Sequence, residues 1–505
     1  MKEWLWIAAG VALGVLLAGL VGDGDSGSDD GKAAAAPLEV QVEQVHLGWA
    51  TNDVYRTMTA MWFSDAPAEA TQRIVYSTNR HPGELTEAEA RDLYESEIVG
   101  SAKAIHPTQA PDGSAITTTA FDGLYYTAEL DGLEPGTRYF FRVVDGQGAA
   151  TREWWFRTIA PDQEVMFAFG GDSRRPYEDA GVPFAELRSK PDAATNWPQM
   201  RDFVTSGSAA KRPDFMLFLG DFVNSGDSQE QWKHWLRGWQ ENAVSPAGRM
   251  IPIVPVVGNH EMGTHPNVNS SYEWCMDQFA FPSEDPWFAL DFPNLHITVL
   301  AATFRQVSSS SAWRKSEAEI EAQRAWLEAD LASDQATDAA WRIVAFHVNY
   351  FGCYAAGRDY PSDAYLQAWT KLFQESAVDL VLMGHTHNYT RSWPILLSDE
   401  DIAMLRTTAE NLTGDSSEGI TYITHGAWGA PPNVLAEGAS CQVRDWIAAA
   451  AGHPVIATAT ARKTSSGEDR LTVRVENTRG DRIDTFTLPY SVEQMLPARY
   501  EEVIR

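Results

Sequence analysis

The sequence is poor in cysteine: only Cys275, Cys353 and Cys441 occur among its 505 residues. At most one disulfide bond can form, so no disulfide framework holds the fold. The spacing of the three cysteines matches neither a zinc knuckle nor a CxxC motif, so we do not expect cysteine to ligate a metal. Buried thiols are the expected state at these positions.

The sequence also lacks an excess of basic residues. Its 39 Lys and Arg stand against 69 Asp and Glu, which gives a net charge of −30 at pH 7. A nucleic-acid backbone or an anionic membrane surface would repel such a chain, so neither is expected as its main partner. An acidic, solvated exterior is the ordinary explanation for this excess.

A long run without charge occurs at the N-terminus. Residues 4–21 contain no charged side chain, and a helix of that length spans roughly 27 Å, close to the bilayer core of about 30 Å. Residues 1–21 are therefore predicted to be a signal peptide or a membrane anchor. The lack of a clear cleavage site favours the anchor. In both cases the body is exported, as a membrane-anchored or secreted protein on the periplasmic or extracellular face.

The length predicts two domains, because one core rarely supports so long a chain. Residues 22–36 (GDGDSGSDDGKAAAA) contain no aromatic side chain and are predicted to be a flexible linker. Residues 37–160 carry short alternating segments such as TMTAMWF and RYFFRVV, which predict a small antiparallel β-sandwich. Only residues 86–96 (TEAEARDLYES) favour a helix in this part.

Residues 161–490 predict a second, layered α/β domain, followed by a tail at 491–505. Apolar runs alternate there with amphipathic stretches at 228–242, 316–332 and 363–377. Strands separated by helices favour βαβ crossovers. From about residue 420 to 489 short alternating segments return, and we expect them to add further strands to this domain.

Five apolar runs of this domain each end in polar residues: VMFAFGGDSR (165–174), FMLFLGDFVN (215–224), IPIVPVVGNHE (251–261), WRIVAFHVN (341–349) and VDLVLMGHTHN (378–388). Ligands collect at the carboxyl ends of strands in α/β sheets, so we expect these clusters to converge on one edge. Their carboxylates, amide and imidazoles suit first-row divalent metals. Taken singly, each cluster also has a structural explanation, such as a turn or a core histidine.

The ordered set GD, GD, GNHE, H and GHTH resembles the calcineurin-like metallophosphoesterase superfamily. Residues 128–158 (AELDGLEPGTRYFFRVVDGQGAATREWWFRT) are similar to the closing strands of a fibronectin type III domain. The combination looks most like the purple acid phosphatase branch. This resemblance implies a layered β-sandwich flanked by helices, the metallophosphoesterase fold, preceded by an all-β fibronectin type III-like (purple acid phosphatase N-terminal-like) sandwich.

The resemblance also implies a binuclear centre of two divalent metal ions, with Mn, Zn or Fe as candidates. Six side chains would hold the ions: Asp172, Asp221, Asn259, His347, His385 and His387. Asp221 would bridge the pair. Asp172 and His387 would complete the first site, and the other three side chains would complete the second.

The implied reaction is hydrolysis of a phosphate ester by a metal-bound hydroxide, without a covalent enzyme intermediate. His260 would lie near the leaving group, where it would donate a proton or stabilise the developing charge. Glu261 would orient His260 by fixing its ring.

Two positions depart from the family pattern. Purple acid phosphatases carry GDxxY, whose tyrosinate binds ferric iron and causes the colour, whereas this chain has Asn224 at that place in GDFVN. Other branches carry DxH where this chain has Arg174 in DSR. We therefore expect a colourless protein whose first ion binds more weakly, with Asn224, His265 or His425 as the substitute ligand. Arg174 is expected to bind the substrate phosphate, because a guanidinium can contact two oxygens.

The leading hypothesis is an exported, metal-dependent hydrolase of phosphoric esters that acts on monoesters like an acid phosphatase. A phosphodiesterase or nucleotide hydrolase on the same fold is the first alternative. A cell-surface binding protein with a degenerate metal site is the second, and the presence of all six ligands argues against it.

Overall fold

The computed structural model describes residues 40–67, 69–104, 123–173, 212–226, 228–261, 272–302, 317–349, 351, 364–398, 419–430, 446–477 and 479–490. The predicted N-terminal segment 1–21, the linker 22–36 and the tail 491–505 lie outside these ranges, so the predictions made for them stay predictions. In the part of the chain that is described, no helix is long and apolar enough to span a membrane.

The first strands form two antiparallel four-stranded sheets. One has the order β1 (Glu43–Gly48), β2 (Met58–Ser64), β6 (Leu124–Leu130) and β5 (Ser101–Lys103), and the other has the order β4 (Ser96–Val99), β3 (Arg73–Ser77), β7 (Arg138–Val144) and β8 (Trp154–Arg157). Trp62 from the first sheet and Phe141 from the second share one buried core. The expected all-β N-terminal domain is confirmed.

Helix α1 (Glu87–Leu93) lies within the stretch that favoured a helix in this part of the sequence. The Thr86 side chain accepts a hydrogen bond from Glu89 N, and the Glu89 carboxylate accepts one from Thr86 N. This capping box satisfies two backbone donors at the start of the helix.

Two larger sheets follow. The first is six-stranded, in the order β11 (Ile253–Pro255), β10 (Phe215–Phe218), β9 (Val165–Gly170), β19 (Val455–Lys463), β20 (Asp469–Asn477) and β21 (Arg482–Leu488). The second is seven-stranded, in the order β12 (Phe288–Phe292), β13 (Leu295–Val299), β14 (Trp341–Phe346), β15 (Leu380–Met383), β17 (Thr421–His425), β16 (Tyr389–Ser392) and β18 (Ile447–Ala451). Phe167 and Leu217 of the first sheet share a core with Ile343 and Leu382 of the second.

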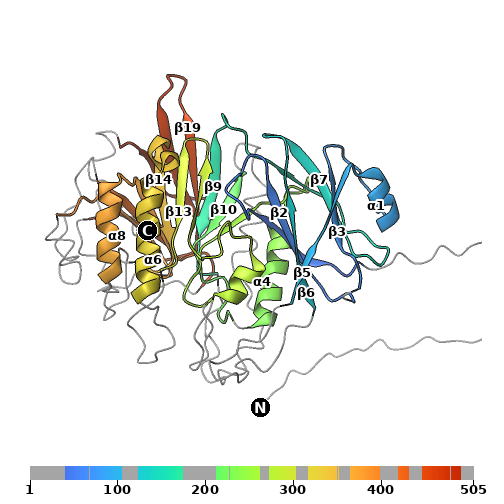
Figure 1. Ribbon diagram of the computed structural model, residues 1–505. Helices are drawn as coiled ribbons and strands as arrows, with labels where there is room; N and C mark the ends of the chain where they lie inside the picture. Colours follow the sequence, from blue (N-terminus) through green and yellow to red (C-terminus); the bar gives the residue numbers. More distant parts are fainter. Residues whose placement is uncertain are drawn as a thin grey trace, which may run out of the picture. The chain divides into compact units, whose positions relative to one another are not determined.

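Helices cover the outer faces of these two sheets. In Figure 1, α6 (Glu317–Leu331) and α8 (Ala364–Glu375) lie side by side against the seven-stranded sheet. Three tryptophans of α4 (Gln229–Asn242) pack with Met216 and Phe218 of the six-stranded sheet. Two shorter helices, α5 (Glu273–Gln278) and α7 (Asp334–Asp338), complete the described set. The layered β-sandwich flanked by helices is therefore confirmed.

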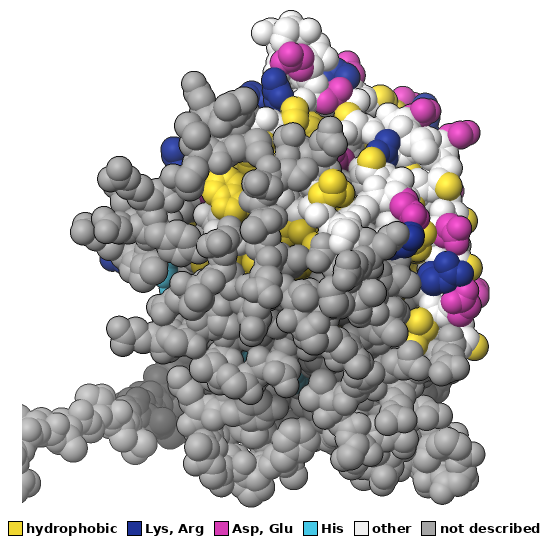
Figure 2. Space-filling model, turned by 90° about the vertical axis from the view of Figure 1, so that its left-hand side faces the viewer, with side chains coloured by type: hydrophobic (Ala, Val, Ile, Leu, Met, Phe, Trp, Pro, Cys, Tyr) yellow, Lys and Arg dark blue, Asp and Glu magenta, His cyan; other side chains and the backbone are white. Residues whose placement is uncertain are grey.

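The charged surface residues and the described cysteine are placed as the sequence predicted. On the described part of the face in Figure 2, Lys and Arg side chains are interspersed with Asp and Glu. Cys275 is free and buried, as expected, while Cys353 and Cys441 lie outside the described residues.

One buried ion cluster joins several of these elements. His296 of β13 has its Nδ1 2.7 Å from Asp291 Oδ1 of β12 and its Nε2 3.2 Å from Asp330 Oδ2 of α6. Asn52, in the loop after β1, donates to the other oxygen of Asp291. Burial disfavours a charged ring, but the two carboxylates outweigh it and raise the pKa of His296 to about 9.

We predict that this cluster makes stability depend on pH. The pKa of His296 in the folded state is about 9, above its ordinary value of 6.5, so its contribution is complete below pH 6.5 and is lost as the pH rises through 9. The substitution His296→Gln should lower the free energy of unfolding below pH 6.5 by on the order of 2 kcal/mol and flatten the profile above it. Urea unfolding of the full chain across this range measures both effects.

The control for this experiment is His453→Gln, in the turn between β18 and β19. It makes the same change of residue type outside the ion cluster, so its pH profile is the reference for His296→Gln. If His296→Gln and His453→Gln give the same profile, the buried ion cluster does not carry the pH dependence.

Candidate metal centre

Strands from both large sheets deliver the predicted ligands to one place: Asp172, Asp221 and Asn259 follow β9, β10 and β11, and His347, His385 and His387 follow β14 and β15. The five strand ends converge as expected, although the strands belong to two sheets and not to one. The sheets meet where His347 Nδ1 lies 2.6 Å from Leu219 O and where His385 N donates to Asp172 Oδ2 at 2.8 Å.

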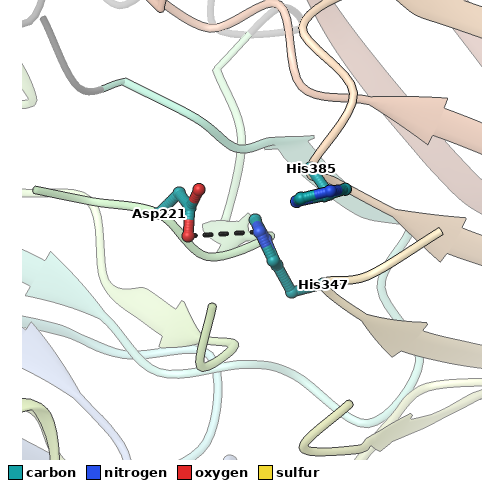
Figure 3. Close-up of side chains that lie close together, drawn as sticks. All are labelled: Asp221, His347 and His385. Carbon is teal, nitrogen blue, oxygen red and sulfur yellow. Dashed lines mark ion pairs between the residues drawn. The ribbon is translucent and has the colours of Figure 1, made fainter. Parts of the chain in front are cut away.

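Asp221, His347 and His385 present ligand atoms that all lie within 4.8 Å of one another (Figure 3). His347 Nε2 is 3.1 Å from Asp221 Oδ1, and the two imidazole rings meet edge to face with their centroids 5.3 Å apart. Asn259 Oδ1 lies 3.1 Å from His347 Nε2 and 3.0 Å from His385 Nδ1. The structure thus brings together the four side chains predicted for the second ion.

The hydrogen bonding of His347 shows that this group suits a cation. Its Nδ1 faces the carbonyl oxygen of Leu219, so that nitrogen carries a proton. In a neutral ring, Nε2 would then turn a lone pair toward the oxygens of Asp221 and Asn259. Burial opposes a second proton, but the Asp221 and Asp172 carboxylates outweigh it and raise the pKa of His347 to about 9. A bound cation would replace that proton.

Asp172 and His387 extend the group on one side. Asp172 is fully buried, and its Oδ1 lies 3.5 Å from His387 Nε2. Burial raises the pKa of Asp172 above its ordinary value, and the neighbouring Asp221 carboxylate adds to this against the opposing effect of His347. Two adjacent buried carboxylates need positive charge beside them, which fits the first of the two predicted ions.

Three of the predicted ligands have left-handed backbone conformations. The φ angle is +62° at Asp172, +54° at Asp221 and +69° at His385, and each of these residues follows a glycine. Such angles are uncommon outside glycine and cluster at functional sites. The short motifs GD and GH therefore mark turns that redirect the chain directly after a buried strand.

Glu261 has a different role from the predicted one. Its fully buried carboxylate accepts hydrogen bonds from the backbone amides of Asp221 and Gly258, both at 2.8 Å, and of Phe222 at 2.9 Å. Burial and the nearby Asp221 carboxylate raise the pKa of Glu261 to about 8. The prediction that Glu261 orients His260 is corrected: it holds the backbone of the turn that carries Asp221.

His260 lies at the edge of the cluster and is oriented by Asn224. Its Nδ1 is 2.7 Å from the Asn224 carbonyl oxygen, and its Nε2 is 3.8 Å from Asp221 Oδ2. Its backbone N–H donates to Asp221 Oδ1 at 3.0 Å. Asn224 thus contacts His260 through its backbone, and metal ligation by the Asn224 amide stays a prediction.

The predictions made for Arg174 and His265 are not tested by the described residues. Arg174 and His265 lie outside them. The His425 ring is fully buried, with edge-to-face contacts to Phe169 at 5.9 Å and Tyr389 at 6.0 Å. Burial lowers the pKa of His425 to about 3. These contacts place the His425 ring in the core, and its suggested role as a substitute ligand stays a prediction.

Gly426 was missed by the sequence analysis, although it directly follows His425. A Cβ atom there would lie 2.4 Å from Thr386 O and 2.7 Å from Asp172 Oδ2. The GHTH turn and the Asp172 carboxylate approach this backbone so closely that only glycine fits. No motif of the sequence signals such an approach.

We predict that Gly426→Ala disturbs the metal centre. Because backbone atoms of Thr386 cannot move aside cheaply, the added methyl group should displace the Asp172 carboxylate and weaken binding of one ion by about tenfold or more. Elemental analysis after dialysis against limiting metal measures the occupancy.

Gly48→Ala is the matched control, because its nearest neighbours would lie 3.1 Å and 3.2 Å away, at Ile253 O and Ala280 Cβ, in the core. It should leave the metal content unchanged even if it lowers stability. Full occupancy in Gly426→Ala would show that the turn adjusts without moving Asp172.

Comparison with known families agrees with this geometry. Residues 192–389 match the family Calcineurin-like phosphoesterase, and residues 42–158 match the family Purple acid Phosphatase, N-terminal domain. Of the six side chains predicted to hold the two ions, the first range includes all except Asp172, which precedes it.

Curated relatives are similar over part of their length. Phosphoenolpyruvate phosphatase of Allium cepa is 24% identical over 322 residues, which cover 60% of this chain and 58% of that protein. A purple acid phosphatase of Glycine max is 25% identical over 300 residues, with 56% of each chain covered. An uncharacterized protein of Mycobacterium tuberculosis is 28% identical over 330 residues, which cover 61% of this chain and 59% of that protein. The chain therefore spans less than two thirds of the length of these relatives.

Solved structures share the fold. The purple acid phosphatase PPD1 from yellow lupin seeds aligns with a TM-score of 0.62 at 17% identity, over 91% of this chain and 76% of that one. The structure of PhoD aligns with a TM-score of 0.53 at 11% identity, over 91% and 94% of the two chains. At such identities the similarity establishes the architecture and not the chemistry.

Proposed function

Because this chain joins a purple acid phosphatase N-terminal domain to a calcineurin-like phosphoesterase domain, we propose that it is a metal-dependent hydrolase of phosphoric esters that acts on monoesters. The observation that carries the proposal is the cluster of Asp221, Asn259, His347 and His385, extended by Asp172 and His387. Its donor set of carboxylates, imidazoles and one amide fits a pair of divalent cations such as Mn, Zn or Fe. We further propose that the body is exported and tethered by its N-terminal segment.

The cations would lower the pKa of water toward neutrality and neutralise charge on the phosphoryl oxygens. The residues of the chain determine where this happens. Asp221 would touch both cations, and its carboxylate is held in place by the amide of His260 at 3.0 Å. His347 is fixed by the Leu219 carbonyl, so its Nε2 keeps a lone pair for a cation.

His260 is placed to assist the departing alcohol. Its Nδ1 faces the Asn224 carbonyl at 2.7 Å, so that nitrogen carries a proton and the ring orientation is set. Its Nε2 lies 3.8 Å from Asp221 Oδ2, beside the metal cluster, and in the protonated ring it would donate to the leaving oxygen. Arg174, two residues after Asp172 in the sequence, would contact the phosphate oxygens.

We predict that removal of divalent metal abolishes ester hydrolysis and that its return restores it. Elemental analysis of the purified chain should find about two divalent ions, and the protein should be colourless. Turnover of a chromogenic phosphomonoester and of a phosphodiester is measured before stripping, after stripping and after reloading. Faster turnover of the diester would favour the phosphodiesterase alternative. That alternative is motivated by Arg174 and Asn224, the two positions that depart from the family pattern.

The variant Asp221→Asn tests the same proposal at a single atom. The amide cannot bridge two cations as the carboxylate would, so kcat should fall by on the order of 10³ or more. Circular dichroism and urea unfolding check that the fold is kept. If turnover is absent from the unaltered chain under every metal loading, the binding-protein alternative is favoured instead.

A third prediction concerns the proton donor. His260→Gln should lower kcat for an alkyl phosphate by about 10²–10⁴, because a poor leaving group needs the proton, and should lower kcat for a nitrophenyl phosphate much less. Metal content should stay as in the unaltered chain. Equal losses for the two esters would mean that His260 stabilises charge or positions the turn instead of donating a proton.

A further inference from the structure

A single hydroxyl joins the two turns that carry the buried carboxylates. Ser173 is buried and directly follows Asp172, and its Oγ donates to the carbonyl oxygen of Phe222 at 2.9 Å. Phe222 in turn directly follows Asp221. The Trp235 indole of α4 donates its Nε1–H to the same hydroxyl at 2.8 Å. The three residues form a continuous chain from the helix to both turns.

The direction of these hydrogen bonds is determined by chemistry. An indole N–H can only donate and a carbonyl oxygen can only accept, so the hydroxyl accepts from Trp235 and donates to Phe222. The Ser173 hydroxyl therefore donates one bond and accepts another, and its rotamer is held from two sides. Such buried chains of polar groups keep their members in one arrangement.

The backbone beside the hydroxyl supplies the rest of the connection. Asp172 N donates to Gly220 O at 2.9 Å, and Ser173 N donates to Asp221 O at 3.1 Å. These two bonds join the turns that follow β9 and β10, directly beyond the last paired residues of the two strands. The side-chain bond from Ser173 then holds the next peptide, where both chains turn away from the sheet.

Helix α4 is a fixed support for this contact. Trp235 is fully buried, stacks on Trp239 with ring centroids 5.7 Å apart, and meets Phe222 edge to face at 4.9 Å. Near the C-terminal end of α4, the Gln240 side chain accepts a hydrogen bond through its Oε1 from Val45 N of β1 at 2.6 Å. The helix is therefore held between the first sheet and the carboxylate turns.

We propose that Trp235 is a positioning residue, which acts through the Ser173 hydroxyl to set the placement of the Asp172 and Asp221 carboxylates and thereby the affinity for the first metal ion. The inference rests on the proposed function only where it takes these carboxylates as ligands of a metal pair. The first ion is the sensitive one, because its described protein ligands are only Asp172, Asp221 and His387. The second site keeps His347 and His385, which are fixed by other contacts.

The test is a calorimetric titration of the metal-free full chain with Zn²⁺. Trp235→Phe keeps an aromatic ring but removes the N–H, and Ser173→Ala removes the hydroxyl. Each should weaken the weaker of two Zn²⁺ sites by about three- to tenfold, as expected for the loss of one buried hydrogen bond. The stronger site shares Asp221 but is also held by His347 and His385, so its affinity should fall less. The double variant should be no weaker than the worse single variant, because both remove the same connection.

Trp239→Phe is the matched control, since it makes the same substitution in the same buried stack of α4. It should lower stability about as much as Trp235→Phe without changing either Zn²⁺ affinity. Equal weakening in Trp235→Phe and Trp239→Phe would overturn the proposal, because loss of packing would then explain both. A single Zn²⁺ site in the unaltered chain would overturn it as well. Two sites without turnover of any ester would contradict the proposed function and leave this inference standing.

Discussion

Two neighbouring buried carboxylates, those of Asp172 and Asp221, are the constraint on which the rest of this structure depends. A carboxylate removed from water is costly unless positive charge and hydrogen-bond donors surround it. The Asp172 carboxylate accepts a hydrogen bond from the backbone amide of His385, and the Asp221 carboxylate accepts one from the backbone amide of His260. Imidazoles lie against both carboxylates, and the remaining demand for positive charge is what a pair of cations would meet.

The placement of these carboxylates also strains the backbone. Left-handed conformations at Asp172, Asp221 and His385 each cost about 1–3 kcal/mol, so the surrounding structure must hold them. Glu261 does this for the Asp221 turn by accepting from three backbone amides. The close approach of Gly426 does it for the Asp172 and GHTH turns. The two sheets and the contacts between the turns together maintain these unfavourable backbone conformations.

The N-terminal sheet takes part in the same support. His46 of β1 has its Nε2 2.7 Å from the carbonyl oxygen of Gln278 in α5, and Tyr125 of β6 donates to the Gln278 side chain at 3.0 Å. Val45 of the same sheet also donates a hydrogen bond to Gln240 of α4. These bonds attach the first sheet to α4 and α5, the helices that follow metal-ligand turns in the sequence. A domain used in this way supports the site, whereas the binding-protein alternative would need it to engage a partner. Its resemblance to fibronectin type III stays a prediction.

The sequence by itself determined what depends on local pattern. The amphipathic stretches 228–242, 316–332 and 363–377 correspond to α4, α6 and α8, because a helix satisfies its own backbone and shows its buried face every few residues. The short motifs GD, GNHE and GHTH identified candidate ligands by residue type. Only the tertiary structure decided that the five strands divide between two sheets, that Glu261 holds a turn, that His425 is a core residue, and that Trp235 reaches Ser173. Trp235 and Ser173 are 62 positions apart in the sequence. Hydrogen bonds over such separations arise from tertiary packing, which leaves no periodic pattern in the sequence.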